Sequence, residues 1–198
     1  MELAALIKLV AEKFGSSVTP SGDKSPWIKV EAGSLVDVAR FCRDDPEGDF
    51  STLSCLSGVD YPDRIELVYH LLSLRKKHAL VLKVSLDRAL PVVASVDDLW
   101  KAANWYEREC YDLLGVTFTG HPDLRRLLLP DDWVGHPLRK DYVPPTEYHG
   151  MSHTRANPLD RAPSLAETAV SAAKATTSET NAATSGAKTT TSETKATP

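Results

Sequence analysis

Two histidines and several carboxylates stand close together in the second half of the chain. His121 and His136 each occupy a Gly-His-Pro triplet, 15 positions apart, with Asp112, Asp123 and Asp132 nearby in the sequence. Imidazoles and carboxylates are metal ligands and general acids or bases, but a metal site needs three or four of them to converge. A proline directly after each histidine instead predicts an extended or turn conformation, in which the imidazole hydrogen-bonds locally.

Asp112 and two further carboxylates, Glu107 and Glu109, fall at the end of an expected helix. Paired carboxylates can do acid–base chemistry, yet Arg108 lies four residues before Asp112, where a helical ion pair is the simpler account. Acids near a helix C-terminus oppose the helix dipole. They therefore need partners outside the helix, and the two arginines at 125–126 are candidates once the chain turns back.

Residues 107–142, here called the motif segment, mix both signs of charge with arginine and aromatic anchors and a run of three leucines. That composition is typical of a specific, hydrogen-bonded protein interface, whereas an ordinary charged surface loop seldom carries three consecutive leucines beside a tryptophan. The interface prediction covers Glu107, Arg108, Glu109, Asp112, Gly115, Gly120, His121, Pro122, Asp123, Arg125, Arg126, Pro130, Asp131, Asp132, Trp133, Gly135, His136, Pro137, Leu138, Arg139, Lys140, Asp141 and Tyr142.

The elements that position this segment follow from apolar periodicity. Helical spacing predicts helices over 2–14 and 34–43, and a third that begins at Ser95 with capping-box spacing to Asp98 and ends at Gly115. Alternation of apolar and polar residues, clearest at 79–86, predicts a sheet with one covered face. The expected strands are 27–31, 50–57, 65–74 and 79–86, with RKKH at 75–78 as a hairpin connection.

The fold class expected from these elements is α+β, with a small mixed β-sheet and helices packed on one face. The expected divisions are an α+β domain over 1–115, an extended interaction strap over 116–163 and a low-complexity tail over 164–198. In the tail AKATTSET recurs as AKTTTSET. Such an Ala/Ser/Thr-rich segment buries too little apolar surface to offset its ordering entropy, so it is predicted to be disordered.

Composition excludes several classes of function. The formal net charge of −4 gives no global basic field for nucleic acid. The three cysteines, Cys42, Cys55 and Cys110, are far apart, which argues against an iron–sulfur or zinc site built by this chain alone. No GxGxxG, GxxxxGK or GxSxG motif is present, and no window approaches the roughly 20 apolar residues of a membrane span.

The motif segment as a whole, ERECYDLLGVTFTGHPDLRRLLLPDDWVGHPLRKDY, resembles the signature of the C-subunit family of the proton-pumping NADH:quinone oxidoreductase, respiratory complex I. The match runs almost unbroken from Glu107 to Tyr142, and the rest of the chain is similar in length and in its order of helices and strands. Leu114 departs from the pattern, where an aromatic is common, but no charged member of the motif is missing.

The resemblance implies a structural component of the peripheral arm, on the cytoplasmic side of the bacterial membrane, that is itself non-catalytic and binds no cofactor. Electrons would pass from NADH through FMN and iron–sulfur clusters in other chains to quinone. The chain would pack on the D subunit, beside the B and I subunits, with its strap along the first of these. The charged residues of the motif segment would form ion pairs within the strap or across to the D subunit.

Three other functions remain as alternatives to the complex I component, and each predicts a different experimental result. Group 4 nickel–iron hydrogenases, coenzyme F420 dehydrogenases and the photosynthetic plastoquinone oxidoreductase contain an equivalent component with part of the same motif. The completeness of GHPDLRR through GHPLRKDY favours the respiratory enzyme. A free-standing metal enzyme would use His121, His136 and an aspartate, and would carry stoichiometric metal. A binding module without redox context would be stable, monomeric and absent from membrane complexes.

Overall fold

In the computed structural model the described residues are 3–21 and 27–152; the predicted tail over 164–198 lies outside them. The chain divides into two compact units, Met1–Pro144 and Pro145–Pro198. The described residues of the first unit form three α-helices, two short 3-10 helices and seven strands. In chain order these are α1 (Leu3–Phe14), η1 (Gly15–Ser17), β1 (Val18–Pro20), β2 (Trp27–Val30), η2 (Ala32–Ser34), α2 (Leu35–Asp44), β3 (Thr52–Asp60), β4 (Arg64–Ser73), β5 (His78–Asp87), β6 (Val92–Ala94), α3 (Ala103–Leu114) and β7 (Thr117–Thr119).

Five strands form one mixed sheet in the order β1-β2-β5-β4-β3. Strands β3, β4 and β5 are an antiparallel meander, and β2 pairs in parallel with β5. The turn between β4 and β5 is the predicted RKKH hairpin, although its last residue, His78, already belongs to β5. The predicted α+β class with a small mixed sheet is confirmed.

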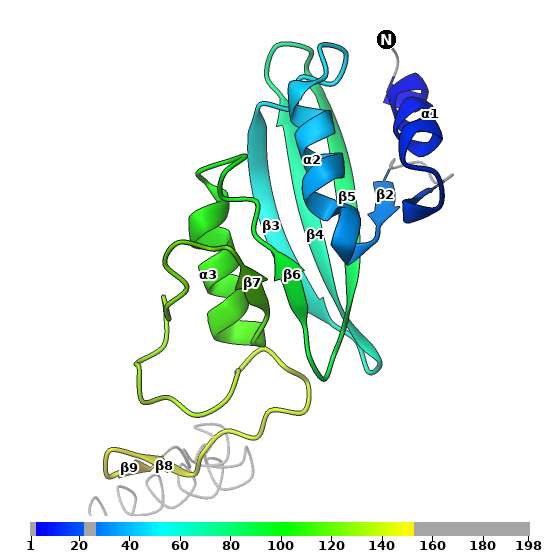
Figure 1. Cartoon of the computed structure of the whole chain (residues 1–198). Coiled ribbons are helices and arrows are strands. Elements are labelled where there is room, and N and C mark those ends of the chain that lie inside the picture. Colours follow the sequence, from blue (N-terminus) through cyan, green and yellow to red (C-terminus); the bar gives the residue numbers. More distant parts are fainter. Residues whose placement is uncertain (1–2, 22–26, 153–198) are drawn as a thin grey trace, which may run out of the picture. The chain divides into compact units, whose positions relative to one another are not determined.

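One face of the sheet is covered, as the alternating pattern predicts. In β5 the buried residues are Leu80, Leu82, Val84 and Leu86, while Lys83 between them is half-buried. Helix α2 lies across this face, and α3 lies beside β3 at the sheet edge (Figure 1). The covered face, α2 and α3 contribute to one hydrophobic core, so the helices share a face as expected.

The third helix begins later than the sequence predicts. The structure starts α3 at Ala103, and the residues before it are irregular, with turns at 97–99 and 101–102. Two contacts explain the later start of the helix, one within the turn and one to a distant part of the chain. The Ser95 hydroxyl accepts a hydrogen bond from the Asp97 N–H only two residues on, and Trp100 is buried with its indole N–H donating to the Phe50 carbonyl. The predicted end at Gly115 is confirmed, because Gly115 is the left-handed C-cap with φ 74°.

Several short pairings were not expected. Strand β1 adds an antiparallel edge to β2, and β6 pairs in parallel with β7, the start of the predicted strap. In the second unit β8 (Glu147–Tyr148) and β9 (Met151–Ser152) form a small hairpin of their own. These additional strands have two or three residues, too short to produce a readable alternation.

Candidate functional site

Helix α3 buries three of its four charged side chains. Glu107, Arg108 and Asp112 are buried, although charged residues are rarely fully buried without a partner. Each of them contacts the chain that follows the helix. The site is therefore a helix whose polar groups hold an irregular segment.

Asp112 binds the chain at the three consecutive leucines. One carboxylate oxygen accepts the backbone N–H groups of Leu127, Leu128 and Leu129 at 3.1, 2.8 and 2.9 Å, and the other accepts Arg126 Nη1 at 3.1 Å. Burial alone would raise the pKa of Asp112, but the three N–H donors and Arg126 outweigh it and leave the pKa below its ordinary value. A turn without ladder partners thus obtains its hydrogen bonds from one side chain.

Arg108 holds the preceding residues from the same helix. Its Nε and Nη2 donate to the carbonyls of Arg125 and Arg126, each at 3.2 Å, and its guanidinium lies over the Trp105 ring. The expected ion pair between Arg108 and Asp112 does not form, because Asp112 is paired with Arg126 instead. The predicted role of Arg126 as an outside partner for a helix acid is confirmed.

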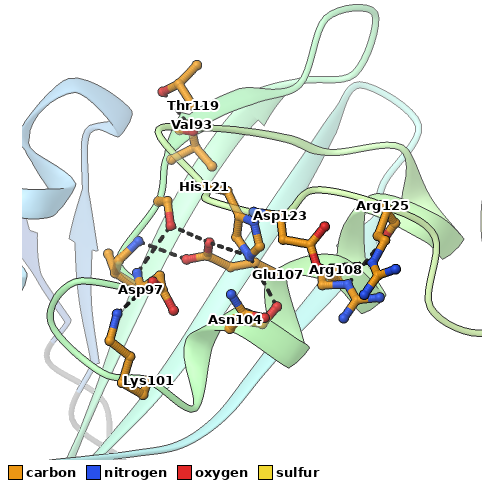
Figure 2. Close-up of polar contacts among 12 residues, drawn as sticks. Val93, Asp97, Lys101, Asn104, Glu107, Arg108, Thr119, His121, Asp123 and Arg125 are labelled. Carbon is orange, nitrogen blue, oxygen red and sulfur yellow. Dashed lines mark hydrogen bonds and ion pairs between the residues drawn. The ribbon is translucent and has the colours of Figure 1, made fainter.

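Glu107 and His121 form a second buried contact, which joins α3 to the first Gly-His-Pro turn. Both side chains are fully buried, with Glu107 Oε2 and His121 Nε2 at 4.0 Å (Figure 2). Glu107 accepts from the Ser95 hydroxyl at 2.6 Å and from the Val96 N–H at 2.8 Å. Burial raises the pKa of Glu107 to about 7, against the opposing effect of these two hydrogen bonds, and the nearby Asp97 carboxylate raises it further.

The hydrogen bonds of His121 define its tautomer. Nδ1 accepts the Asp123 backbone N–H at 3.0 Å, so the proton of the neutral ring is on Nε2, which faces the Asn104 carbonyl at 3.3 Å (Figure 2). This is the local hydrogen bonding that the proline after His121 predicts. Within residues 3–21 and 27–152, no group of three or more His, Cys, Asp and Glu residues could hold a metal ion.

The second Gly-His-Pro turn satisfies the carbonyls at the end of α3. His136 Nδ1 lies 2.9 Å from the Asp112 carbonyl, the Leu138 N–H donates to the Leu113 carbonyl at 3.1 Å, and Arg139 Nε donates to the Leu114 carbonyl at 2.7 Å. The last carbonyls of a helix lack intrahelical partners and attract positive charge. Residues 136–139 therefore act as a C-terminal cap supplied from a distant part of the chain.

Glycine is required at two points of this arrangement. A Cβ on Gly115 would lie 2.5 Å from the His136 imidazole and 3.1 Å from Arg139, at a positive φ. A Cβ on Gly135, at φ 85°, would lie 3.0 Å from the Tyr142 ring. Both positions combine a left-handed backbone with close approach of a side chain.

A buried carboxylate outside the motif segment fixes its far end. Asp60, at the end of β3, pairs with Arg88 at 2.7 and 2.9 Å and accepts the Lys140 N–H at 2.8 Å. Arg88 also contacts Asp141 at 2.8 Å. The hydrogen bond from Arg88 is the largest cause that lowers the pKa of Asp60 to about 2, and burial opposes it. Sequence reasoning missed Asp60 and Arg88, because nothing local to either marks a partner at 140–141.

The remaining predicted residues differ in burial. Arg125 and Asp123 form an exposed pair at 3.0 Å, and the backbone N–H of Trp133 closes a turn on the Pro130 carbonyl at 3.1 Å. Gly120 has φ 82° and open space beside it. Pro137 is half-buried. The exposed members are Glu109, Gly120, Pro122, Asp123, Arg125, Pro130, Asp131, Asp132, Leu138, Lys140 and Asp141.

The segment also exposes apolar side chains. Leu128 is 62% exposed and Val134 is 82% exposed, Leu138 is exposed as well, and so is Val143, directly after the segment. No helix among the described residues is long and apolar enough to cross a membrane.

Comparison with known families decides what this arrangement belongs to. The sequence model of the respiratory-chain NADH dehydrogenase 30 kDa subunit family matches residues 28–148, which include the whole motif segment. The chain belongs to this family. The predicted resemblance is thereby confirmed.

Relatives of the 30 kDa family agree. The C subunit of the NADH-quinone oxidoreductase of Roseiflexus sp. strain RS-1 is 51% identical over 123 residues, covering 61% of this chain and 70% of the relative. The protein of the same name from Chlorobium phaeobacteroides is 43% identical over 153 residues, covering 74% and 92%. A further protein of that name, from Moorella thermoacetica, is 57% identical over 100 residues, covering 50% and 68%.

Two solved structures share the fold of this family member. A trypsin-resistant fragment of Nqo5 is 28% identical with a TM-score of 0.52, covering 63% of this chain and all of the fragment. A chain from the membrane-bound sulfane sulfur reductase, an archaeal respiratory membrane complex, is 25% identical with a TM-score of 0.61, covering 72% and 86%.

Proposed function

We propose that this chain is the structural and assembly C subunit of the peripheral arm of NADH:quinone oxidoreductase, and that it is itself non-catalytic. The complex passes electrons from NADH through FMN and iron–sulfur clusters to quinone, coupled to proton translocation, and all of those cofactors lie in partner subunits. The family and the relatives that carry this name support the assignment.

One observation carries the structural part of the proposal. The buried charged groups of the motif segment, Asp112 and Arg108, bind the chain's own backbone and its own counter-charges, and Asp60 outside the segment binds the Lys140 N–H in the same way. The Asp112 carboxylate receives four donors from the chain itself and is fully buried, so it is not presented to a substrate. This use of charge supports a role in holding shape rather than in chemistry.

The partners in this proposal are the D, B and I subunits, with residues 116–163 as a strap along the first of them. The chain reaches the cytoplasmic face of the membrane through these partners. The related hydrogenase, F420 and plastoquinone complexes are the alternative setting, and the relatives named NADH-quinone oxidoreductase do not favour it. A large partner with paired CxxC nickel ligands would indicate a hydrogenase.

The test is a pull-down of the tagged chain from solubilised membranes, with mass spectrometry of the co-purifying chains and NADH:quinone activity of the eluate. We expect the D, B and I subunits together with that activity. Recovery of the chain without any large redox partner would contradict the proposal.

Arg139→Ala adds a test of the role itself. The variant loses the donor to the Leu114 carbonyl at the end of α3 and should reduce the amount of assembled complex. The iron–sulfur spectra of whatever complex does assemble should stay unchanged. Arg75→Ala is the matched control, since the Arg75 side chain is 84% exposed in the β4–β5 turn. Full assembly of Arg139→Ala with loss of quinone turnover alone would refute a structural role.

A further inference from the structure

The strap concentrates exposed apolar side chains. Ten large hydrophobic residues are exposed among the described residues, and four of them lie between 128 and 143: Leu128, Val134, Leu138 and Val143. Single exposed leucines are ordinary on any surface. Four within one short segment, which is not a helix or a strand, are a pattern that needs a cause.

The backbone under Leu128 is fixed. The N–H groups of Leu127, Leu128 and Leu129 all donate to Asp112, and Arg108 holds the two carbonyls just before them. Leu127 and Leu129 are half-buried, so the turn directs only the middle leucine outward. An apolar side chain on a backbone that is already ordered loses less conformational freedom when a partner covers it.

The buried and half-buried charges of the same segment are already used. Half-buried Arg126 pairs with Asp112 and half-buried Arg139 donates to the Leu114 carbonyl. Asp141 is exposed, but it too is paired, with Arg88. Recruiting them for a partner would leave their present counterparts unpaired in partly buried positions, which is costly. Glu109, Asp131 and Lys140 are exposed, and bringing such solvated charges into a contact costs desolvation that offsets much of the pairing energy.

A cleft adjoins this surface. It has a volume of about 210 Å³ between α3 and the edge strand β3, and Leu138 borders it together with Tyr106, Leu113 and Cys55. A cavity of roughly 150 Å³ is large enough for a benzene ring. The cleft can therefore receive one apolar side chain of the partner beside the apolar side chains that the strap presents.

We infer that the strap binds its partner chain through an apolar contact centred on Leu128 and Val134, and that its ionic groups serve to shape the strap rather than to attract the partner. The fitting partner surface is a protein surface with apolar sockets for these side chains and an apolar side chain for the cleft. The inference rests on the proposed function for the identity of that partner, but not for the chemistry of the contact.

The experiment compares full-length variants expressed in place of the native chain. The ratio of membrane-bound to free chain is measured over a dilution series and in NaCl from about 0.1 to 1 M, a range over which the Debye length falls from about 10 to 3 Å. Leu128→Ser and Val134→Ser should each lower the bound-to-free ratio about tenfold. Leu74→Ser, at 64% exposure in the β4–β5 turn, is the control and should leave the ratio within about twofold.

Folding is separated from binding by the thermal midpoint of each purified chain. It should not change in any of the three variants, because the replaced side chains are exposed. Retention of the native chain should be insensitive to salt. Steep release of the native chain by NaCl, or native-like retention of both Leu128→Ser and Val134→Ser, would overturn the inference.

The same data separate this inference from the proposed function. If the chain co-purifies with the NADH-oxidising complex and the apolar variants stay bound, the inference fails and the proposed function stands. If it co-purifies with a different redox complex and the apolar variants are released, the proposed function fails and the inference stands. If it binds no large partner, both fail.

Discussion

Replacing Glu107 with glutamine should stabilise the protein at alkaline pH and remove most of its pH dependence between pH 4.5 and 7. Glu107 is fully buried, and burial raises its pKa from 4.5 to about 7. Between these two values the unfolded chain releases a proton that the folded chain keeps. The folded state therefore binds more protons, and the free energy of unfolding must fall as the pH rises.

The magnitude follows from the size of the shift. About 2.5 pH units at about 1.36 kcal/mol each correspond to about 3 kcal/mol of stability that is present below pH 4.5 and lost above pH 7. A neutral glutamine does not titrate. It keeps an oxygen for the Val96 N–H, and its amide can donate to the Ser95 hydroxyl, which then accepts. With about 1 kcal/mol allowed for poorer amide geometry, the variant should exceed the native chain by about 2 kcal/mol at pH 8.

The assay is urea unfolding of the full chain at pH 5, 6, 7 and 8, followed by circular dichroism and by tryptophan fluorescence, to which the buried Trp100 contributes. Glu109→Gln is the matched control, because Glu109 lies two residues on in the same helix and is exposed. It should reproduce the native pH profile. If Glu107→Gln loses as much stability between pH 5 and 8 as the native chain, or is less stable at every pH, then the carboxylate is needed as an ion and the reasoning is wrong.

Three further substitutions test the contacts that hold the motif segment. Asp112→Asn should lower the free energy of unfolding by about 3 kcal/mol at pH 7 in urea titrations, since it leaves buried donors without their charged acceptor. Asp123→Asn, at an exposed position, is the control. A decrease below about 1 kcal/mol for Asp112→Asn would contradict the role of Asp112 in holding the segment. Gly115→Ala should lower the thermal midpoint far more than Gly120→Ala, because both have positive φ but only Gly115 lies against His136 and Arg139; equal losses would exclude the steric contribution. The pKa of Asp60 is lowered from 3.8 to about 2, so its carboxylate should contribute about 2 kcal/mol to the free energy of unfolding, fully present above pH 3.8 and lost as the pH falls to 2. In urea titrations at about pH 2 to 5, Asp60→Asn should remove this decrease in stability, whereas the control Asp63→Asn should not.

Sequence reasoning succeeded where a residue's environment depends on its immediate neighbours. The alternation in β5 placed Leu80 and Leu82 in the core, and Gly115 ended a helix because only a left-handed residue suits that position. It failed at Ser95, where the capping-box spacing predicts the start of a helix but the Ser95 side chain instead contacts a residue far along the sequence. There the hydroxyl binds Glu107, which is 12 residues away in sequence.

The candidate site was only partly readable for the same reason. The prediction that the acids of α3 need partners outside the helix was correct in kind, and Arg126 is one such partner. The three backbone N–H groups on Asp112 could not be inferred, because backbone donors leave no trace in side-chain identity. The contact between Asp60 and the Lys140 N–H joins positions 80 residues apart, and no local pattern encodes it.

The density of charge in the motif segment has a physical explanation that does not require a ligand. Residues 120–144 form no strand or helix, so their backbone N–H and C=O groups have no ladder to satisfy them. A chain of that kind stays ordered only if side chains supply the missing donors and acceptors, and Asp112, Arg108 and Arg139 do so. Acids are required to receive N–H groups and arginines to donate to carbonyls, which explains why both signs occur together. It follows that charge density alone does not identify the surface that meets a partner, and this is why the inferred contact is assigned to exposed apolar side chains such as Leu128 and Val134.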